Sequence, residues 1–453
     1  MDITFLGAVE TVTGSKYLLS FDNKRILVDC GLFQGLKELR LRNWKTLPFI
    51  PEKIDAVLLT HSHIDHSGYI PLLVKNGFRG NIYCTEGTRE LCSILLPDSG
   101  HLQEEDAAHA NKYGYSKHKP ALPLYTMEDA IKSLSHFETL PLDTVTTLFD
   151  DFHLQFLSAG HIIGASFVRI QYQGTSVLFS GDLGRPNDPV MKAPTIVTDI
   201  DYLILESTYG DRQHDAGHPK DYLKTIINNT FERGGSLIIP AFAVGRTQVL
   251  LYYISLLKKE NSIPNIPIYL DSPMAINATQ ILLNHQNELR LTPAECQELN
   301  DIAIFVNTPD ESKEIDQDPQ QKIIISASGM ATGGRILFHL NAYAPDDRNT
   351  ILFTGFQSMG TRGSRLLNGE KEIKVHGEMV KVNAEIANLP GVSAHSDFAE
   401  TLGWLSHFQN PPKKVFLTHG EPEAAEALKK KIENKLAGWS CTVPHFEQKE
   451  ILS

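Results

Sequence analysis

A short apolar run that leads directly into histidine or a carboxylate recurs along the chain, and this pattern most constrains the fold. It occurs in DAVLLTHSHIDHSG, TSVLFSGDLGR, DYLILESTYGDR and KKVFLTHGE. Brief apolar runs bounded by turns are typical of strands covered on both faces, which indicates a layered α/β fold. In such folds, functional groups collect beyond the strand ends. The sequence therefore predicts one site assembled from several strand ends.

The middle of the chain repeats strand and loop without histidine at the strand ends. Examples are GGSLIIPAFAVGRTQ, IPIYLDSPMA, KIIISASGMATGGR and NTILFTGFQSMGTRG. Because histidine returns at His395 and His419, we expect a second α/β domain inserted into the first. The expected boundaries are 1–208 and 376–453 for the first domain and 209–375 for the inserted one. Within the insertion, the polar stretch 309–322 is expected to be a loop.

Composition limits what the protein can bind and where it works. The 453 residues carry a net charge of −12, so any polyanion must be held by a local patch or by metal. Five scattered cysteines without a CxxC pair are typical of reduced thiols in a cytoplasmic protein. The chain has no apolar run of about 18 residues, and its N-terminus lacks the pattern of a signal peptide. We therefore expect a cytoplasmic protein without a membrane span.

The six residues HSHIDH, at positions 61–66, concentrate metal-ligand chemistry. Neutral imidazoles and a carboxylate are the ligands that zinc prefers. His61 and His63 are two residues apart, so in an extended turn both can face one ion. Asp65 and His66 follow where the chain turns toward a helix and can reach a second ion. A solvated loop is a poor alternative, because an apolar strand leads straight into the motif.

Three further residues complete two metal sites. Taken alone, His161 would be a core histidine, Asp182 a turn residue and His419 a helix cap. Two zinc ions that share a hydroxide would lower its pKa and stabilise charge on a phosphoryl or acyl oxygen. The expected ligands are His61, His63 and His161 for one ion, Asp65, His66 and His419 for the other, and Asp182 as the bridge between them.

These motifs resemble a known family over almost the whole chain. THSHIDHSG, AGHIIGAS, SGDLGR and the final THGE resemble the metallo-β-lactamase fold, whereas ESTYGDR, PAFAVGRTQ, DSPMA, SASGMATGGR and VSAHSDF resemble its β-CASP group. That group includes the nuclease subunit of the cleavage and polyadenylation machinery and stand-alone prokaryotic relatives. The resemblance implies an αββα sandwich with an inserted α/β domain. It also implies a two-zinc enzyme that cleaves RNA internally, with 5′-exonuclease action left open.

The resemblance also assigns residues. Glu206, His395 and His419 fall at the group's motifs A, B and C, and relatives that act on DNA usually have valine at motif C, so His419 favours RNA. A metal-bridging hydroxide would attack phosphorus in line, and His395 would contact the phosphate or protonate the leaving oxygen. Glu206 would orient a ligand histidine, and Asp29 is a similar candidate. We count Asp65, His395 and Glu206 as the catalytic residues.

Arginines in glycine-containing loops are the candidates for gripping phosphate. Glycine lets backbone N–H groups approach a phosphate, and arginine binds it in a two-pronged fashion. Six arginines occupy such loops after strands: Arg185, Arg212, Arg246, Arg335, Arg362 and Arg365. The expected substrate-binding residues are Arg246, Arg335, Arg362, Ser328 and Gly329.

Three other functions share parts of this pattern. Thioesterases, lactonases and β-lactamases use the same histidine motif, but they would not need an insertion of roughly 160 residues. A DNA-directed nuclease of the same fold and a non-catalytic RNA-processing scaffold are the two remaining alternatives; loss of ligands would mark the scaffold. RNA is the expected substrate, and the sequence leaves open a homodimer and a place in an RNA-processing complex.

Overall fold

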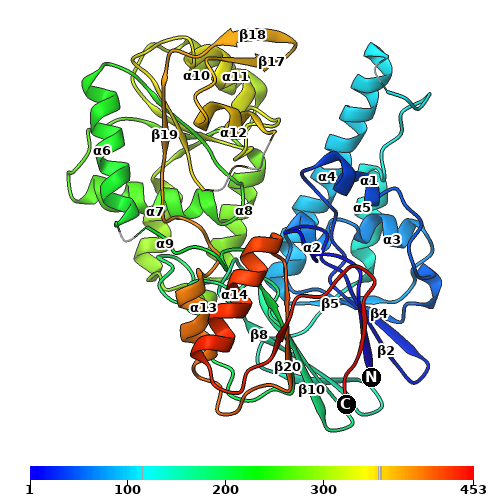
Figure 1. Ribbon diagram of the computed structural model, residues 1–453. Helices are drawn as coiled ribbons and strands as arrows, with labels where there is room; N and C mark the ends of the chain where they lie inside the picture. Colours follow the sequence, from blue (N-terminus) through cyan, green and yellow to red (C-terminus); the bar gives the residue numbers. More distant parts are fainter. Residues whose placement is uncertain (115, 216, 356, 358–359) are drawn as a thin grey trace. The chain divides into compact units, whose positions relative to one another are not determined.

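The computed structural model describes residues 1–114, 116–215, 217–355, 357 and 360–453, which form two compact units (Figure 1). Unit 1 contains residues 1–187, 193–213 and 395–453, and unit 2 contains residues 188–192 and 214–394. Both units mix helices and strands, which confirms the predicted α/β class. The long segment of unit 2 interrupts unit 1 within the sequence.

Unit 1 is built on two seven-stranded sheets among the described residues. The first sheet has the order β22 (Lys449–Ile451), β1 (Asp2–Phe5), β2 (Tyr17–Phe21), β3 (Lys24–Val28), β4 (Ala56–Leu58), β5 (Asn81–Cys84) and β6 (Phe137–Thr139). The second sheet has the order β21 (Cys441–Thr442), β20 (Lys414–Thr418), β11 (Tyr202–Glu206), β10 (Thr175–Phe179), β9 (Ser166–Tyr172), β8 (Phe152–Ser158) and β7 (Val145–Phe149). The chain's last strand thus pairs with its first.

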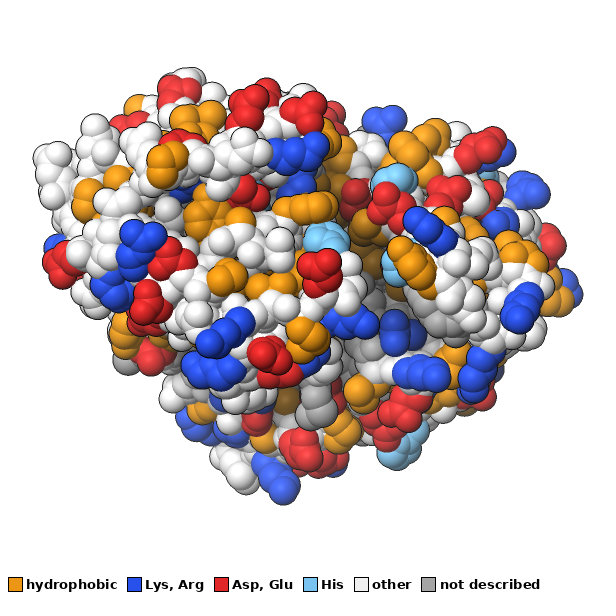
Figure 2. Space-filling view, turned by 90° about the horizontal axis from the view of Figure 1, so that it is seen from above, with side chains coloured by type: hydrophobic (Ala, Val, Ile, Leu, Met, Phe, Trp, Pro, Cys, Tyr) orange, Lys and Arg blue, Asp and Glu red, His pale blue; other side chains and the backbone are white. Residues whose placement is uncertain are grey.

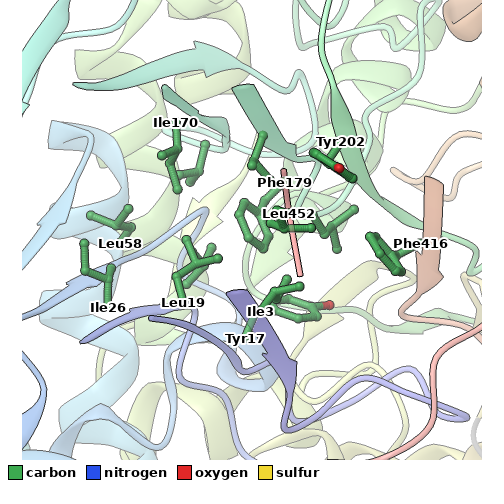
Figure 3. Packing of buried hydrophobic residues seen from close by; sticks show 14 of the residues in the cluster. Ile3, Tyr17, Leu19, Ile26, Leu58, Ile170, Phe179, Tyr202, Phe416 and Leu452 are labelled. Atoms are coloured by element: carbon green, nitrogen blue, oxygen red, sulfur yellow. The ribbon is translucent and has the colours of Figure 1, made fainter. Parts of the chain in front are cut away.

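The two sheets enclose the main hydrophobic core of unit 1 (Figure 3). Side chains alternate along β2, where Tyr17, Leu19 and Phe21 are buried and the residues between them are less so. Leu19 of the first sheet belongs to the same buried cluster as Phe179 and Phe416 of the second. This alternation is the pattern of a strand with one face toward a core, and burial of that face fixes the register with which β2 pairs with its neighbours.

Helices cover both outer faces of this sandwich. α3 (Ile70–Lys75), α4 (Glu86–Tyr113) and α5 (Met127–Ser133) contribute to a second buried cluster with strands of the first sheet. α13 (Phe398–Leu405) packs on the second sheet, where the rings of Phe167 and Trp404 lie 5.2 Å apart, and α14 (Pro422–Lys435) contacts β20. The helices α1 (Lys37–Arg42) and α2 (Ile64–Ser67) follow β3 and β4. Unit 1 therefore has the expected αββα layers.

Several parallel strands of unit 1 end at one edge of the sandwich and bring the predicted ligands there. β10, β11 and β20 run parallel, and Asp182, Glu206 and His419 lie at or just after their ends. β3 and β4 are parallel in the facing sheet, and the HSHIDH segment follows β4. The predicted assembly of one site from several strand ends thus has a structural basis.

Unit 2 contains a parallel sheet and a short hairpin. Its sheet order is β14 (Ile304–Phe305), β13 (Ile268–Leu270), β15 (Ile323–Ser326), β12 (Leu237–Pro240), β16 (Thr350–Phe353) and β19 (Glu385–Asn388), and the hairpin pairs β17 (Glu372–Val375) with β18 (Glu378–Lys381). Its helices are α6 (Pro219–Glu232), α7 (Arg246–Lys259), α8 (Pro273–Asn284), α9 (Pro293–Asp301), α10 (Pro309–Gln317), α11 (Ile336–Tyr343) and α12 (Arg362–Leu367).

The expected loop over 309–322 is wrong, because its first nine residues form α10. The side chain of Thr308 accepts a hydrogen bond from the Glu311 amide, and the Glu311 carboxylate accepts one from the Thr308 amide, which forms a capping box. Ser312 and Ile315 are buried one turn apart, so a narrow face anchors an otherwise polar helix. Across the described part of the chain, no helix has the length and apolar character needed to cross a membrane.

Candidate metal centre

The HSHIDH segment is held by backbone contacts to the loop that follows β3. The amides of Cys30 and Leu32 donate to the carbonyls of His66 and Ile64 at 2.7 and 2.9 Å. A Cβ on Gly31 would lie 1.6 Å from the carbonyl oxygen of Asp65, so only glycine permits this approach. The two loops are therefore locked together before any ligand is considered.

The first ligand group brings together three histidines and Asp182. His63 Nδ1 lies 3.1 Å from His61 Nε2 and 3.3 Å from His161 Nε2. Asp182 Oδ2 lies 3.3 Å from the Nε2 atoms of both His61 and His161. Four donor atoms from three separate loops thus surround one point.

The second group joins Asp65, His66 and His419 to the other oxygen of Asp182. His66 Nε2 lies 3.2 Å from His419 Nε2 and 3.2 Å from Asp182 Oδ1. His419 Nε2 lies 3.3 Å from Asp65 Oδ2. Asp182 therefore directs one carboxylate oxygen at each group, which is the arrangement expected of a bridging ligand.

The spacing of these donors fits zinc. With Zn–N and Zn–O distances of about 2.0 to 2.1 Å, donors at the corners of a tetrahedron lie about 3.3 Å apart. The closest donor pairs in both groups lie 3.1–3.3 Å apart. Asp182 Oδ1 is buried and accepts no hydrogen bond from any described residue, although such atoms are normally satisfied. A cation in each group would satisfy it and explain why ring nitrogens face one another.

The opposite nitrogens of three ligands are fixed by neighbours. Asp29 Oδ2 lies 2.7 Å from His66 Nδ1, and the hydroxyl of Thr60 lies 3.1 Å from His61 Nδ1. The hydroxyl of Thr208 lies 3.0 Å from His419 Nδ1. Such contacts select the tautomer that leaves Nε2 available to a metal.

Asp29 has the kind of contact that the sequence predicts for it, whereas the contacts of Thr60 and Thr208 were not predicted. Thr60 directly precedes the histidine motif and Thr208 follows Glu206. A threonine next to a predicted ligand was the available signal in the sequence, but threonine is equally common in loops that hold no ligand.

Glu206 contacts His395 directly, and it is linked to the ligand His419 through the Thr208 hydroxyl. Its carboxylate oxygens lie 3.1 and 3.2 Å from His395 Nδ1, and it also accepts hydrogen bonds from the Leu183 amide and the Thr208 hydroxyl. The His395 side chain is 21% exposed, whereas that of Asp182 is 2% exposed. His395 is thus fixed by Glu206 at the accessible side of the cluster, 3.9 Å from Asp182 Oδ2.

The histidines of the cluster differ in pKa, because burial lowers the pKa of some and nearby carboxylates raise the pKa of others. Burial lowers the pKa of His61 to about 3, and it lowers the pKa of His161 well below the usual value. Burial also opposes the charge on His66 and His395, but carboxylates outweigh it there. Asp182 and Asp29 raise the pKa of His66, and Glu206 and Asp182 raise the pKa of His395 to about 10. The buried carboxylates thus favour positive charge on the neighbouring groups of the cluster.

The predicted phosphate-gripping arginines make bonds within the chain. Arg335 donates to Asp271 Oδ1 at 2.6 Å, and Arg362 donates to the carbonyls of Ala331 and Lys374 at 3.1 and 2.7 Å. The other four also have partners: Arg185 with Glu400, Arg212 with Asp211, Arg246 with the Val392 carbonyl and Arg365 with Glu370.

The two remaining predicted substrate-binding residues, Ser328 and Gly329, lie beyond β15 in unit 2. The Ser328 hydroxyl accepts a hydrogen bond from the Thr332 amide at 3.0 Å, and the Gly329 carbonyl accepts one from Gln357 at 3.1 Å.

Comparison with known proteins agrees with this arrangement. Family models match residues 11–226 (metallo-β-lactamase superfamily), 247–366 (β-CASP domain) and 379–444 (zinc-dependent metallo-hydrolase RNA specificity domain). The chain is 35% identical over 441 residues to ribonuclease TTHA0252 of Thermus thermophilus, covering 95% of both chains. It is also 35% identical over 462 residues to the transcription termination factor FttA of Methanosarcina mazei, covering 96% of this chain and 69% of that protein.

A solved structure shares the fold over the full length. The crystal structure of a protein of unknown function from Enterococcus faecalis superposes with a TM-score of 0.56 at 13% identity, covering 100% of this chain and 99% of that one. With the two sheets, the inserted unit and the His/Asp cluster described above, these matches determine the family. The chain belongs to the β-CASP group of the metallo-β-lactamase superfamily and is a zinc-dependent metallo-hydrolase.

Proposed function

We propose that the protein is a two-zinc ribonuclease that cleaves RNA phosphodiester bonds internally. The observation that carries the proposal is the two adjoining ligand groups that share Asp182, one oxygen for each group. The relatives named as a ribonuclease and as transcription termination factors support RNA as the substrate. The expected ligands are the seven residues His61, His63, Asp65, His66, His161, Asp182 and His419.

Zinc at these positions would acidify a water molecule and offset the charge that develops on the scissile phosphate. The chain's own residues set the position of the ligands and the side from which a phosphate can approach. Asp182 lies among the surrounding histidines at the centre of the cluster, with one carboxylate oxygen directed at each group. His63 and Asp65 have side chains that are 31% and 19% exposed, so the cluster opens to solvent on their side. A phosphate can approach from there.

His395 is proposed to deliver the proton to the leaving oxygen. Glu206 contacts its Nδ1 atom, so the opposite nitrogen, Nε2, is the one that can donate toward substrate. General-acid assistance of this kind contributes about 10² to 10⁴-fold to rate. Asp65 is proposed to act both as a ligand and in catalysis, and Glu206 acts by orienting His395.

The test is cleavage of an unstructured RNA that is end-labelled separately at each terminus, with zinc-loaded wild type and His395→Ala. Internal fragments that fall by at least 10²-fold in the variant, with zinc content unchanged, support the proposal. Mononucleotides released only from a 5′-monophosphate end would reveal an exonuclease instead. Matched DNA and a β-lactam substrate run in parallel; cleavage of either in place of RNA would overturn the proposal.

We also propose a cytoplasmic location. All five cysteines are buried and unpaired, which is typical of a reducing compartment.

A further inference from the structure

The segment from Lys37 to Lys45 carries more positive than negative charge. Lys37, Arg40 and Lys45 are exposed and Arg42 is half-buried, against a single acidic residue, Glu38. Among the described residues, none of the four cations forms an ion pair within 4 Å, although the carboxylate of Asp106 on α4 interacts electrostatically with Arg40. In a chain of net charge −12, this is a local surplus that can attract an anion.

On the face shown in Figure 2, basic and acidic side chains are interspersed. The arginines that the sequence singled out for phosphate are each bonded within the chain, for example Arg335 to Asp271 and Arg365 to Glu370. Lys37 and Lys45 form no ion pair among the described residues, whereas Arg40 faces Asp106 and Arg42 lies over the rings of Phe33 and Phe446.

An exposed aromatic ring lies within the same segment. Trp44 is 58% exposed, which is unusual for so large an apolar side chain. Together with Lys45, Thr46, Leu47, Tyr69 and Asn76, it lines a shallow surface cavity of about 450 Å³ that is open to solvent.

The segment is fixed to the metal centre. Asn43 accepts from the Phe33 amide at 2.9 Å and donates to the Phe33 carbonyl at 2.8 Å. The guanidinium of Arg42 lies 5.4 Å from the centre of the Phe33 ring, and the adjacent Leu32 is hydrogen-bonded to Ile64 in the histidine loop. α1 lies beside α4 and on the same side of unit 1 as α2 (Figure 1). The segment is therefore joined to the histidine loop through Leu32 and Phe33.

We propose that Lys37, Arg40, Trp44 and Lys45 form a binding surface for single-stranded RNA, here called the α1 face. The three cations contact backbone phosphates, and one base stacks on Trp44 over the cavity. Aromatic stacking combined with a basic track is how proteins bind single strands without reading sequence. The inference rests on the proposed ribonuclease function, because it supplies the path by which that substrate reaches the metals.

The experiment measures binding separately from cleavage. A fluorescein-labelled, unstructured oligoribonucleotide is titrated with zinc-loaded full-length protein carrying His395→Ala, and anisotropy is followed at several salt concentrations. In this background we compare Lys37→Gln/Arg40→Gln/Lys45→Gln with a matched triple, Lys224→Gln/Lys371→Gln/Lys381→Gln. The matched lysines are exposed and change the net charge equally. Trp44→Ala is compared with Trp44→Phe.

The α1 triple is expected to reduce the slope of log K against log salt by about 2, since each contact to a single strand contributes about 0.7. The matched triple should leave the slope unchanged. Trp44→Ala should weaken binding about 5- to 150-fold, which is the value of one stacked base, and Trp44→Phe should restore most of it.

Two results would overturn the inference. In one, the two triples behave alike and Trp44→Ala binds as tightly as its parent. In the other, Trp44→Ala leaves RNA binding intact but abolishes self-association in sedimentation, which would identify the face as a contact between copies of the chain. If the wild-type protein binds RNA through the α1 face but does not cleave it, the proposed ribonuclease function fails while the inferred binding surface stands.

Discussion

Replacing Asp29 by asparagine tests how the chain prepares the metal centre. Asp29 is fully buried. Its Oδ1 accepts from the Thr60 amide at 2.8 Å, and its Oδ2 accepts from the Thr60 hydroxyl at 2.9 Å and lies 2.7 Å from His66 Nδ1. The Thr60 amide can only donate, so the asparagine must keep its oxygen there and place its NH₂ group where Oδ2 was.

That NH₂ group is a donor, so His66 Nδ1 must become the acceptor and move its proton to Nε2. Nε2 is the atom that faces His419 and Asp182, and a protonated Nε2 cannot ligate zinc. A hydrogen bond to a charged group is worth about 1.5–3 kcal/mol, or roughly 10- to 150-fold. We therefore expect zinc affinity at the second group to fall about 10- to 100-fold, the usual effect of such a contact.

Competition with a chromophoric chelator, followed by elemental analysis of the dialysed protein, measures this change. Asp201→Asn is the matched control, because Asp201 accepts from the amide and hydroxyl of Ser176 at 2.8 Å, outside the cluster. The variant should retain about one tightly bound zinc per chain, and the control should retain two. Wild-type zinc affinity in Asp29→Asn would refute the tautomer argument.

Two further predictions concern the fold. Gly31→Ala should cost several kcal/mol of unfolding free energy or prevent folding, because its Cβ would lie 1.6 Å from the Asp65 carbonyl; wild-type stability in urea unfolding would contradict the close approach. Burial opposes the charge on His339, but hydrogen bonds to Asp271 and Asp316 raise its pKa. The charged form of His339 therefore contributes its full stabilisation of the fold below pH 6.5, the pKa of histidine in an unfolded chain. This stabilisation declines as the pH rises through the folded pKa, by up to about 1.4 kcal/mol per pH unit. The stability difference between wild type and His339→Gln should therefore shrink above pH 6.5, and a constant difference in denaturant titrations would exclude the charged form.

The sequence was most informative where chemistry and periodicity agree. Strand ends in a layered α/β fold converge, so residues as distant as His61 and His419 could be placed together from the pattern alone. Their ring nitrogens now lie in adjoining groups around Asp182. Apolar runs likewise predicted the strands and the inserted unit.

The sequence was less informative where a contact depends on side-chain geometry. α10 was missed because its composition is polar, although the Thr308 and Glu311 capping box was readable. Arg335 and Arg362 follow glycine-rich loops, but no pattern could show that carboxylate and carbonyl partners within unit 2 would bind them. The pairing of Glu206 with His395 also depends on how two loops meet.

Anomalous diffraction at the zinc absorption edge, from crystals of the zinc-loaded protein, tests the central claim most directly. We predict two peaks in unit 1. One lies among His61, His63, His161 and Asp182, the other among Asp65, His66, His419 and Asp182. A single peak, or zinc bound elsewhere with this cluster empty, would contradict the two-metal centre on which the proposed RNA cleavage depends.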